Sequence, residues 1–249
     1  MAELIEIAPG GFEEIDGEHF VEFALYGAAG ELPELPRGRA HIGGVTVEVA
    51  GQELADDWAD RWKAFHRPVT IGDRLHVRPP WTDPEEGRID VVIDPGQAFG
   101  TGAHPTTQMC LEILLDVTAG PLADLGCGSG VLAISAAKLG FAPIVAVDNE
   151  VAAVEATLHN AGANGVTLDR VERVDLRTGP VPVERVTVAN LVRPLLLEVA
   201  ALMPEQPETL IVSGLLEGEE DEVAAAFAPL RERRRLRLQG WSALLLTRP

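Results

Sequence analysis

The 249-residue sequence has little cysteine and a shortage of positive charge, and each shortage excludes a class of protein. Its two cysteines, Cys110 and Cys127, are too few for a disulfide framework, and no histidine cluster accompanies them to suggest a zinc site. Lysine and arginine number 20 against 39 acidic residues, which gives a net charge of −19. Such a chain repels nucleic-acid backbones, so we expect no direct nucleic-acid binding and favour a cationic partner.

Long apolar runs are also missing. No stretch approaches the roughly 20 apolar residues that span a bilayer. The opening residues, MAELIEIAPGG, lack the basic segment that begins a signal peptide. We therefore expect a cytoplasmic protein with no membrane partner. With 46% hydrophobic residues, the chain can bury a sizeable core as one large domain or two unequal ones.

The most informative stretch is residues 122–148, LADLGCGSGVLAISAAKLGFAPIVAVD. A short apolar run leads into Gly126, Gly128 and Gly130, an amphipathic segment follows, and a second apolar run ends on Asp148. This order predicts a βαβ unit with a nucleoside site at its mouth. Glycine lets the backbone turn sharply and lets a ligand approach closely. Asp148 follows Gly126 by about 20 residues, the distance at which an acid at a strand end meets ribose hydroxyls.

The spacing of the glycines narrows the choice of nucleoside. A dinucleotide fingerprint would place glycine or alanine where this chain has Val131, so a hydride-transferring dehydrogenase is a distant alternative. No Gly-Lys-Ser/Thr follows, which excludes a P-loop. A glycine-rich turn in an unrelated α/β protein would explain the loop alone, although not the loop, helix and terminal acid together.

A second candidate segment, residues 94–107, reads DPGQAFGTGAHPTT and precedes an apolar-periodic helix. Proline suits the first helical turn, and the threonines can offer hydroxyls beside the exposed N–H groups there. We expect this segment to form a wall of the ligand site, with glycines leaving room for the ligand. Its candidate contacts are Phe99, Gly100 and Thr107, while His104 is a candidate for hydrogen bonding, proton removal or a structural role in the loop.

Alternating strands and helices after residue 120 predict an α/β fold, a Rossmann-like doubly wound, mainly parallel sheet with an antiparallel last strand pair. A small α+β N-terminal domain precedes it. The expected helices cover residues 54–66, 151–163, 195–203 and 217–231. The expected strands cover residues 20–26, 45–49, 74–77, 89–93, 171–174, 186–189, 210–213, 235–238 and 243–247. The basic run RERRRLR, residues 231–237, is expected at a helix end and a strand edge.

We expect three parts along the chain. Residues 1–52 form the small N-terminal domain, with a role in substrate recognition, and residues 53–88 form a linker helix and strand. Residues 89–249 form the ligand-binding domain.

Several strings resemble one enzyme family. The Asp-x-Gly-x-Gly-x-Gly pattern of residues 124–130 is similar to the loop with which Rossmann-like methyltransferases hold S-adenosylmethionine. Residues 94–107 closely resemble a segment peculiar to the PrmA-type methyltransferases, which modify large-subunit ribosomal protein eleven, and residues 56–81 resemble that family's linker helix and strand. The strings at residues 188–191 and 213–216 look like its strand ends. The likeness extends from about residue 50 to the C-terminus.

The resemblance assigns roles to particular residues. Carried over by position, the family's cofactor contacts fall on Thr107, Gly126, Asp148 and Asn190. Gly128 and Gly130 share the loop. Asn190 follows a predicted strand, where its amide could position the incoming nucleophile; a strand-end turn former is the competing interpretation. Asn190 and His104 are therefore the candidate catalytic residues, and no metal ligands are expected.

The sequence also departs from the family pattern. Ala103 stands where the family usually has threonine, and the loop of residues 190–194 is one residue shorter and gains a charge at Arg193. The opening residues resemble the end of the family's first helix running into the next strand. We accordingly expect either a curtailed recognition domain or a late start codon.

The resemblance implies an S-adenosylmethionine-dependent protein N-methyltransferase acting on amines, of lysine or of the N-terminus, in a large-subunit ribosomal protein. A basic ribosomal protein suits the acidic chain. Two alternatives stay open at this point. One is a PrmA-like methyltransferase of another protein, and the other is a cofactor-binding interaction module without activity.

Overall fold

The computed structural model describes residues 13–16, 21–24, 38–42, 45–50, 66–95 and 100–249. The chain divides into two compact units, Met1–Arg61 and Trp62–Pro249. The expected helix over residues 54–66 lies outside the described residues except at its last position, and Phe99 lies outside them as well. The three-part division at residues 52 and 88 stays a prediction.

The described residues of the first unit form two antiparallel strand pairs. Strand β1 (Glu13–Asp16) pairs with β2 (Val21–Ala24), and β3 (Gly38–Ile42) pairs with β4 (Val45–Val49). The alternation that predicted strands at residues 20–26 and 45–49 is confirmed, in the second case to the residue.

A seven-stranded sheet in the order β10-β9-β8-β11-β12-β14-β13 forms the centre of the second unit. The first five strands of that order run parallel, and β14 runs antiparallel to both of its neighbours. Their bounds are β8 Leu122–Leu125, β9 Ile144–Asp148, β10 Arg170–Arg173, β11 Val186–Asn190, β12 Thr209–Leu216, β13 Arg231–Leu238 and β14 Trp241–Thr247. The expected mainly parallel sheet with an antiparallel last pair is confirmed.

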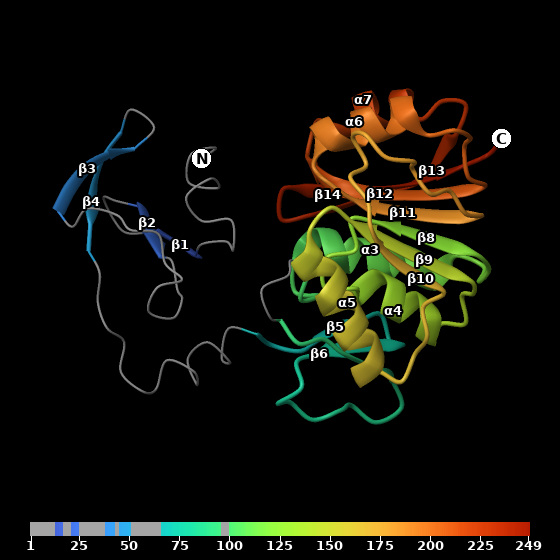
Figure 1. Cartoon of the computed structure of the whole chain (residues 1–249), viewed down its shortest axis with the longest axis horizontal. Helices are drawn as coiled ribbons and strands as arrows, with labels where there is room; N and C mark the ends of the chain where they lie inside the picture. The colour runs from blue at the N-terminus through green and yellow to red at the C-terminus, as the bar shows by residue number, and fades with distance from the viewer. Residues whose placement is uncertain (1–12, 17–20, 25–37, 43–44, 51–65, 96–99) are drawn as a thin grey trace. The chain divides into compact units, whose positions relative to one another are not determined.

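Helices cover both faces of this sheet (Figure 1). On one face lie α3 (Pro105–Asp116), α4 (Val131–Lys138) and α5 (Val151–Ala163). On the other lie α6 (Arg193–Leu202) and α7 (Glu220–Ala226). Each face has its own apolar core, and the central strands are buried on both sides, as a parallel sheet requires.

A small three-stranded sheet packs against α3 and α4 on the side away from the main sheet (Figure 1). It contains β5 (Val69–Ile71), β6 (Leu75–Arg78) and β7 (Ile89–Val92). The sequence predicted β6 and β7 and missed β5, which is only three residues long. Strand β7 delivers the chain to Asp94, at the start of the 94–107 segment.

The expected helix over residues 217–231 is wrong at its C-terminal end. Helix α7 ends at Ala226, and Arg231 begins strand β13. Pro229 explains the early end, because proline cannot continue a helix and disfavours helical conformation in the residue before it. The run of residues 231–237 is therefore not a helix end; it makes up nearly all of the edge strand, so the expected strand edge is confirmed.

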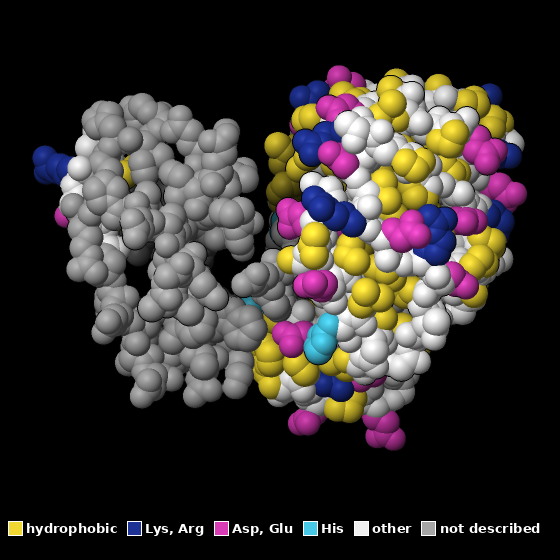
Figure 2. All heavy atoms as spheres, in the orientation of Figure 1, with side chains coloured by type: hydrophobic (Ala, Val, Ile, Leu, Met, Phe, Trp, Pro, Cys, Tyr) yellow, Lys and Arg dark blue, Asp and Glu magenta, His cyan; other side chains and the backbone are white. Residues whose placement is uncertain are grey.

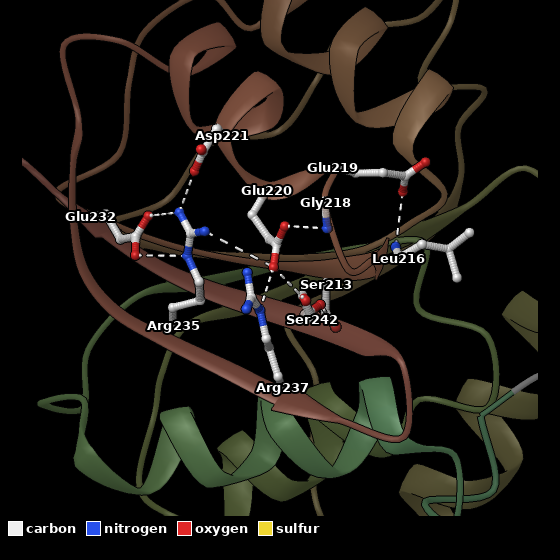
Figure 3. A network of polar contacts seen from close by, with 10 residues as sticks. All are labelled: Ser213, Leu216, Gly218, Glu219, Glu220, Asp221, Glu232, Arg235, Arg237 and Ser242. Atoms are coloured by element: carbon white, nitrogen blue, oxygen red, sulfur yellow. Dashed lines mark hydrogen bonds and ion pairs between the residues drawn. The ribbon is translucent and has the colours of Figure 1, made fainter.

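Three of the arginines of this strand, Arg234, Arg235 and Arg237, pair with acidic residues. Arg234 pairs with Glu112 and Asp116 of α3, at 2.5 and 2.7 Å. Arg235 and Arg237 pair with acidic residues of α7 (Figure 3). Across the visible face of residues 66–249, basic side chains likewise stand beside acidic ones (Figure 2). The basic run is thus no continuous positive surface.

Among the residues described, no helix has the length and apolar character to cross a membrane.

Candidate functional site

The carboxyl ends of β8, β9, β11 and β12 lie at one edge of the main sheet. The strand order reverses between β8 and β11, because the chain proceeds outward from β8 through β9 to β10 and then returns to β11 on the other side. Ligands of open α/β sheets bind in the crevice at such a switch point. The glycine loop follows β8 at this edge, and Asp148 and Asn190 end β9 and β11 there.

The glycine loop leaves β8 in a backbone conformation that other residues rarely adopt. Gly126, Gly128 and Gly130 all have positive φ, at 77°, 52° and 82°. The N–H groups of Gly126 and Cys127 both donate to the carbonyl oxygen of Val147 in β9, at 2.8 and 3.0 Å. The sequence pattern thus predicted the loop, and the dihedral angles show why these positions need glycine.

Two of these glycines also make room for neighbouring side chains. A Cβ on Gly126 would lie 2.4 Å from Cδ2 of Leu191, and a Cβ on Gly130 would lie 3.0 Å from Thr157 and 3.1 Å from its Cα. At these two positions, the missing side chain serves packing within the protein in addition to any close approach by a ligand.

Asp148 ends β9 with its carboxylate fixed against the loop. Oδ2 accepts a hydrogen bond from the N–H of Gly128 at 2.9 Å, and Oδ1 accepts one from the N–H of Glu150 at 3.1 Å. The residue is partly exposed. Because each carboxylate oxygen can accept more than one hydrogen bond, both oxygens can still accept from a ligand's hydroxyl groups.

Asp124 is a buried acid beside the same loop. It is the first residue of the glycine motif, but the sequence assigned it no role. Its Oδ2 accepts from the N–H of Ala133 in α4 at 3.1 Å, whereas its Oδ1 is a buried acceptor without a donor among the described residues. Burial raises the pKa of Asp124 to about 7, and the negative charge of Asp148 adds to the increase.

The start of α3 is organised by His104. Its Nδ1 accepts from the N–H of Thr106 at 3.3 Å, which makes it the N-cap of the helix, and lies 2.7 Å from Oγ1 of Thr106. Its ring meets that of Trp241 edge to face, with centroids 5.0 Å apart. Burial lowers the pKa of His104, so the ring is neutral at pH 7. With Nδ1 engaged as an acceptor, this geometry favours the structural role over proton removal.

Asn190, the last residue of β11, contacts the first turn of α3. Its Nδ2 donates to Oγ1 of Thr106 at 3.2 Å and to Oγ1 of Thr107 at 3.5 Å, and both threonines are buried. No described residue donates to its Oδ1. The structure therefore brings Asn190, His104 and Thr107 into one cluster. Thr106, which joins them, was missed as a candidate, although it stands beside Thr107 in the segment.

The glycines of the 94–107 segment also contact the protein itself. The carbonyl oxygen of Gly100 accepts from Oγ of Ser129 at 2.5 Å, which joins this segment to the glycine loop. A Cβ on Gly102 would lie 2.7 Å from Cγ1 of Val77 in β6, so this glycine allows close packing against the small sheet. The expectation that both glycines only leave room for a ligand is thus too narrow.

Polar side chains of helix α5 and its C-cap form hydrogen bonds that hold the site's loops in place. The sequence did not indicate these residues. Oγ1 of Thr157 donates to the carbonyl oxygen of Gly128 at 3.0 Å. Asn160 in α5 binds backbone groups of Ser129 and Asp94, and Asn164, the C-cap one turn later, binds backbone groups of Val92 at the end of β7. Paired asparagines on one helix face are a signal that could have been noticed.

The cysteines offer no nucleophile. Cys110 and Cys127 are both buried and free. Burial raises the pKa of Cys127, and it raises the pKa of Cys110 to about 12. Both thiols therefore stay protonated near neutral pH and act as small apolar groups.

Two clefts of about 240 and 220 Å³ lie at the opposite edge of the sheet, beside the amino ends of β11 and β12. They share Arg185, whose Nη2 donates to the carbonyl oxygens of Thr118 and Ala119. These clefts contain none of the candidate residues.

Comparison with known proteins identifies close relatives. Residues 34–249 match the family model described as "Ribosomal protein L11 methyltransferase (PrmA)". A ribosomal protein L11 methyltransferase of Klebsiella pneumoniae is 41% identical over 187 residues, covering 72% of this chain and 64% of that protein. One from Escherichia coli is 40% identical over 185 residues, covering 71% and 63%. The chain thus spans a little under two thirds of the length of these relatives.

Solved structures agree with the fold. A ribosomal protein L11 methylase from Lactobacillus delbrueckii subsp. bulgaricus superposes with a TM-score of 0.65 at 26% identity, covering 74% of this chain and 99% of that one. A Pyrococcus abyssi tRNA (uracil-54, C5)-methyltransferase, solved with S-adenosyl-L-homocysteine, gives a TM-score of 0.51 at 17% identity and covers 66% and 43%. The second likeness concerns the fold alone.

Proposed function

Because this chain belongs to the ribosomal protein L11 methyltransferase (PrmA) family, we propose that it uses S-adenosylmethionine to methylate amines of ribosomal protein L11. The amines are those of lysine side chains or of the N-terminus. The observation that carries the proposal is the fixed carboxylate of Asp148 at the end of β9, beside a glycine loop at the switch point of the sheet. A carboxylate held there suits the hydroxyl pair of a ribose.

The residues present fit this cofactor. Asp148 supplies acceptors for hydroxyl groups, and the glycine loop exposes backbone rather than side chains beside it. The buried Oδ1 of Asp124 is an acceptor without a partner among the described residues, and it lies beside the same loop. Gly126, Gly130, Thr107 and Asn190 complete the proposed cofactor site.

The cofactor, when bound, supplies a methyl group activated by its positively charged sulfur. The protein then has to align an amine with that methyl group in a site that excludes water. Asn190 suits this role, because two threonine hydroxyls hold its Nδ2 and leave Oδ1 to accept a hydrogen bond from the amine. A lysine amine, with an ordinary pKa of about 10.4, must lose a proton first, and nearby positive charge lowers that value. We propose that solvent accepts the proton that the lysine amine loses, because His104 is engaged as the N-cap of α3.

The substrate is proposed from the relatives, which are named as methyltransferases of ribosomal protein L11. A net charge of −19 supports a basic protein as partner. Methylation of another basic protein is the second candidate, because a net charge of −19 suits basic partners in general.

Calorimetric titration with S-adenosylmethionine and with NAD tests the cofactor assignment. We expect S-adenosylmethionine to bind and NAD to give no binding heat. Gly128→Val is the matched control, because a branched residue at φ 52° distorts the loop, and this variant should lose cofactor binding while staying folded. Binding of NAD, or normal S-adenosylmethionine affinity in the folded variant, would contradict the proposal.

A further inference from the structure

We propose that Asn160 is a positioning residue that ties the glycine loop to Asp94, just after β7, and so preorganises the glycine loop for the cofactor. This inference rests on the proposed function, since it concerns the same site.

The side chain of Asn160 bridges two backbones that are distant in the sequence. Its Nδ2 donates to the carbonyl oxygen of Ser129 in the glycine loop at 2.9 Å. Its Oδ1 accepts from the N–H of Asp94, 66 residues earlier in the chain, at 3.0 Å. The residue is 1% exposed, so neither backbone group can exchange this partner for bulk water.

Ser129 makes the second connection between the same two segments. Its Oγ donates to the carbonyl oxygen of Gly100 at 2.5 Å and accepts from the N–H of Val131 at the start of α4. Asp94 and Gly100 are therefore each tied to the glycine loop, Asp94 through Asn160 and Gly100 through Ser129.

Helix α5 supplies the rigidity that such a bridge needs. Thr157, three residues before Asn160, donates to the carbonyl oxygen of Gly128 and is fully buried. One helix face thus holds two successive carbonyl groups of the loop. When residues of a rigid helix hold a binding loop in place, the loop loses less conformational entropy on ligand binding.

Asn164 offers a matched control within the same helix. Its Oδ1 accepts from the N–H of Val92 at 2.8 Å, and its Nδ2 donates to the carbonyl oxygens of Val92 and Asn160. It therefore ties the end of α5 to the end of β7, and among the described residues its side chain makes no hydrogen bond with the glycine loop. Loss of Asn164 removes three hydrogen bonds, against two for Asn160, so it should destabilise the fold at least as much.

The test compares Asn160→Ala with Asn164→Ala in the full chain, by calorimetry with S-adenosylmethionine and by urea unfolding. Asn160→Ala removes buried hydrogen bonds next to the glycine loop, so it should raise the Kd for S-adenosylmethionine by about tenfold. Asn164→Ala should raise this Kd by less than about threefold. Unfolding should show Asn164→Ala to be no more stable than Asn160→Ala. In methyl transfer, KM for the cofactor should rise in Asn160→Ala with kcat changed less than about threefold.

Asn160→Asp provides a variant of the same size, because it keeps an oxygen for the Asp94 N–H and replaces the N–H that donates to the Ser129 carbonyl with a second oxygen. It should show the same rise in Kd. Normal affinity in either Asn160 variant, or an equal rise in Asn164→Ala, would overturn the inference while leaving the proposed function intact. Failure of the wild-type chain to bind S-adenosylmethionine would instead overturn both.

Discussion

The carboxylate of Asp148 is held in a fixed orientation and can still accept hydrogen bonds from a ligand, as a binding carboxylate must. Two backbone N–H groups, from Gly128 and Glu150, fix its orientation on either side, and the residue stays partly exposed at the sheet edge. A side chain that is oriented before the ligand arrives loses less conformational entropy on binding.

Replacing Asp148 by alanine should weaken S-adenosylmethionine binding by about 1.5–3 kcal/mol, because the ribose hydroxyls lose a charged acceptor. Calorimetry on a variant shown to be folded by circular dichroism measures this directly. Glu150→Ala is a suitable control, since it keeps the backbone N–H that Glu150 donates to Asp148. Unchanged affinity in Asp148→Ala would remove Asp148 from the site.

For His104, the sequence left a structural role and proton removal open, and the geometry favours the structural role. Its Nδ1 caps α3, which in turn presents Thr106 and Thr107 to Asn190. The proposed effect of His104 on methyl transfer is therefore indirect, through the position of these threonines.

His104→Ala should lower the free energy of unfolding by about 1 kcal/mol, and His104→Asn should recover most of this loss because asparagine is a good N-cap. We expect kcat of His104→Asn to stay within about threefold of wild type. Loss of a general base costs about 10²–10⁴-fold. A fall of that size in both variants, measured across pH, would show that the histidine removes the proton.

Among the elements, those with strong local signals were predicted well. Residues 151–163 were predicted as a helix, and α5 has those bounds. The strand, glycine loop and helix that begin at Leu122 were also correct, because their apolar runs and turn residues are contiguous. The edge strand β13 was misplaced at its start, because a run of arginines carries no apolar alternation and its pairing with β14 is a tertiary property.

Parts of the site could not be predicted for a similar reason. The contacts of Asn160 and Asn164 reach backbone groups 66 and 72 residues away, and the pairing of Asn190 with Thr106 spans 84 residues. Local patterns indicate which residues can form such bonds and not which partners the fold brings to them. The position of Asp148 was predictable because it ends a strand that local apolar pattern predicts.

The connection between α7 and the last two strands depends on Glu220, a buried carboxylate (Figure 3). Its Oε1 accepts from Nε of Arg237 at 2.7 Å and from Oγ of Ser242 at 2.9 Å, and its Oε2 accepts from the N–H of Gly218 at 2.6 Å. Burial alone would raise the pKa of this carboxyl, but the hydrogen bonds outweigh it and lower the pKa to about 2.

This lowered pKa predicts a pH dependence of stability. The ordinary pKa of the group is 4.5, so ionised Glu220 stabilises the fold fully above that pH, and the stabilisation is lost as pH falls toward 2. Glu220→Gln should lower the free energy of unfolding by about 2 kcal/mol at pH 7, and the difference from wild type should shrink below pH 4.5. Urea unfolding at several pH values measures this.

Asp221→Asn is the control on the same helix. Asp221 is exposed and pairs with Arg235 at 2.6 Å, so its loss should cost less than about 0.5 kcal/mol. A difference between wild type and Glu220→Gln that stays constant from pH 7 to pH 2 would show that the carboxylate's ionisation does not contribute.

For the molecule as a whole, family membership and fold support the proposed methyl transfer. The family match extends over residues 34–249, and the Lactobacillus relative aligns over 99% of its length. The candidate residues at the carboxyl edge of the sheet come from segments spread between residues 100 and 190. Such convergence of distant segments at a switch point indicates a ligand site.

The most direct test of the account is transfer of labelled methyl groups to isolated ribosomal protein L11, with the product examined by intact-mass and peptide mass spectrometry. The wild-type chain should add methyl groups to one or more amines of L11, and Asp148→Ala should do so much more slowly at the same cofactor concentration. A wild-type chain that binds S-adenosylmethionine yet leaves L11 unlabelled, while labelling another protein in a cell extract, would contradict the proposed substrate. A chain that labels no protein would contradict the proposed activity.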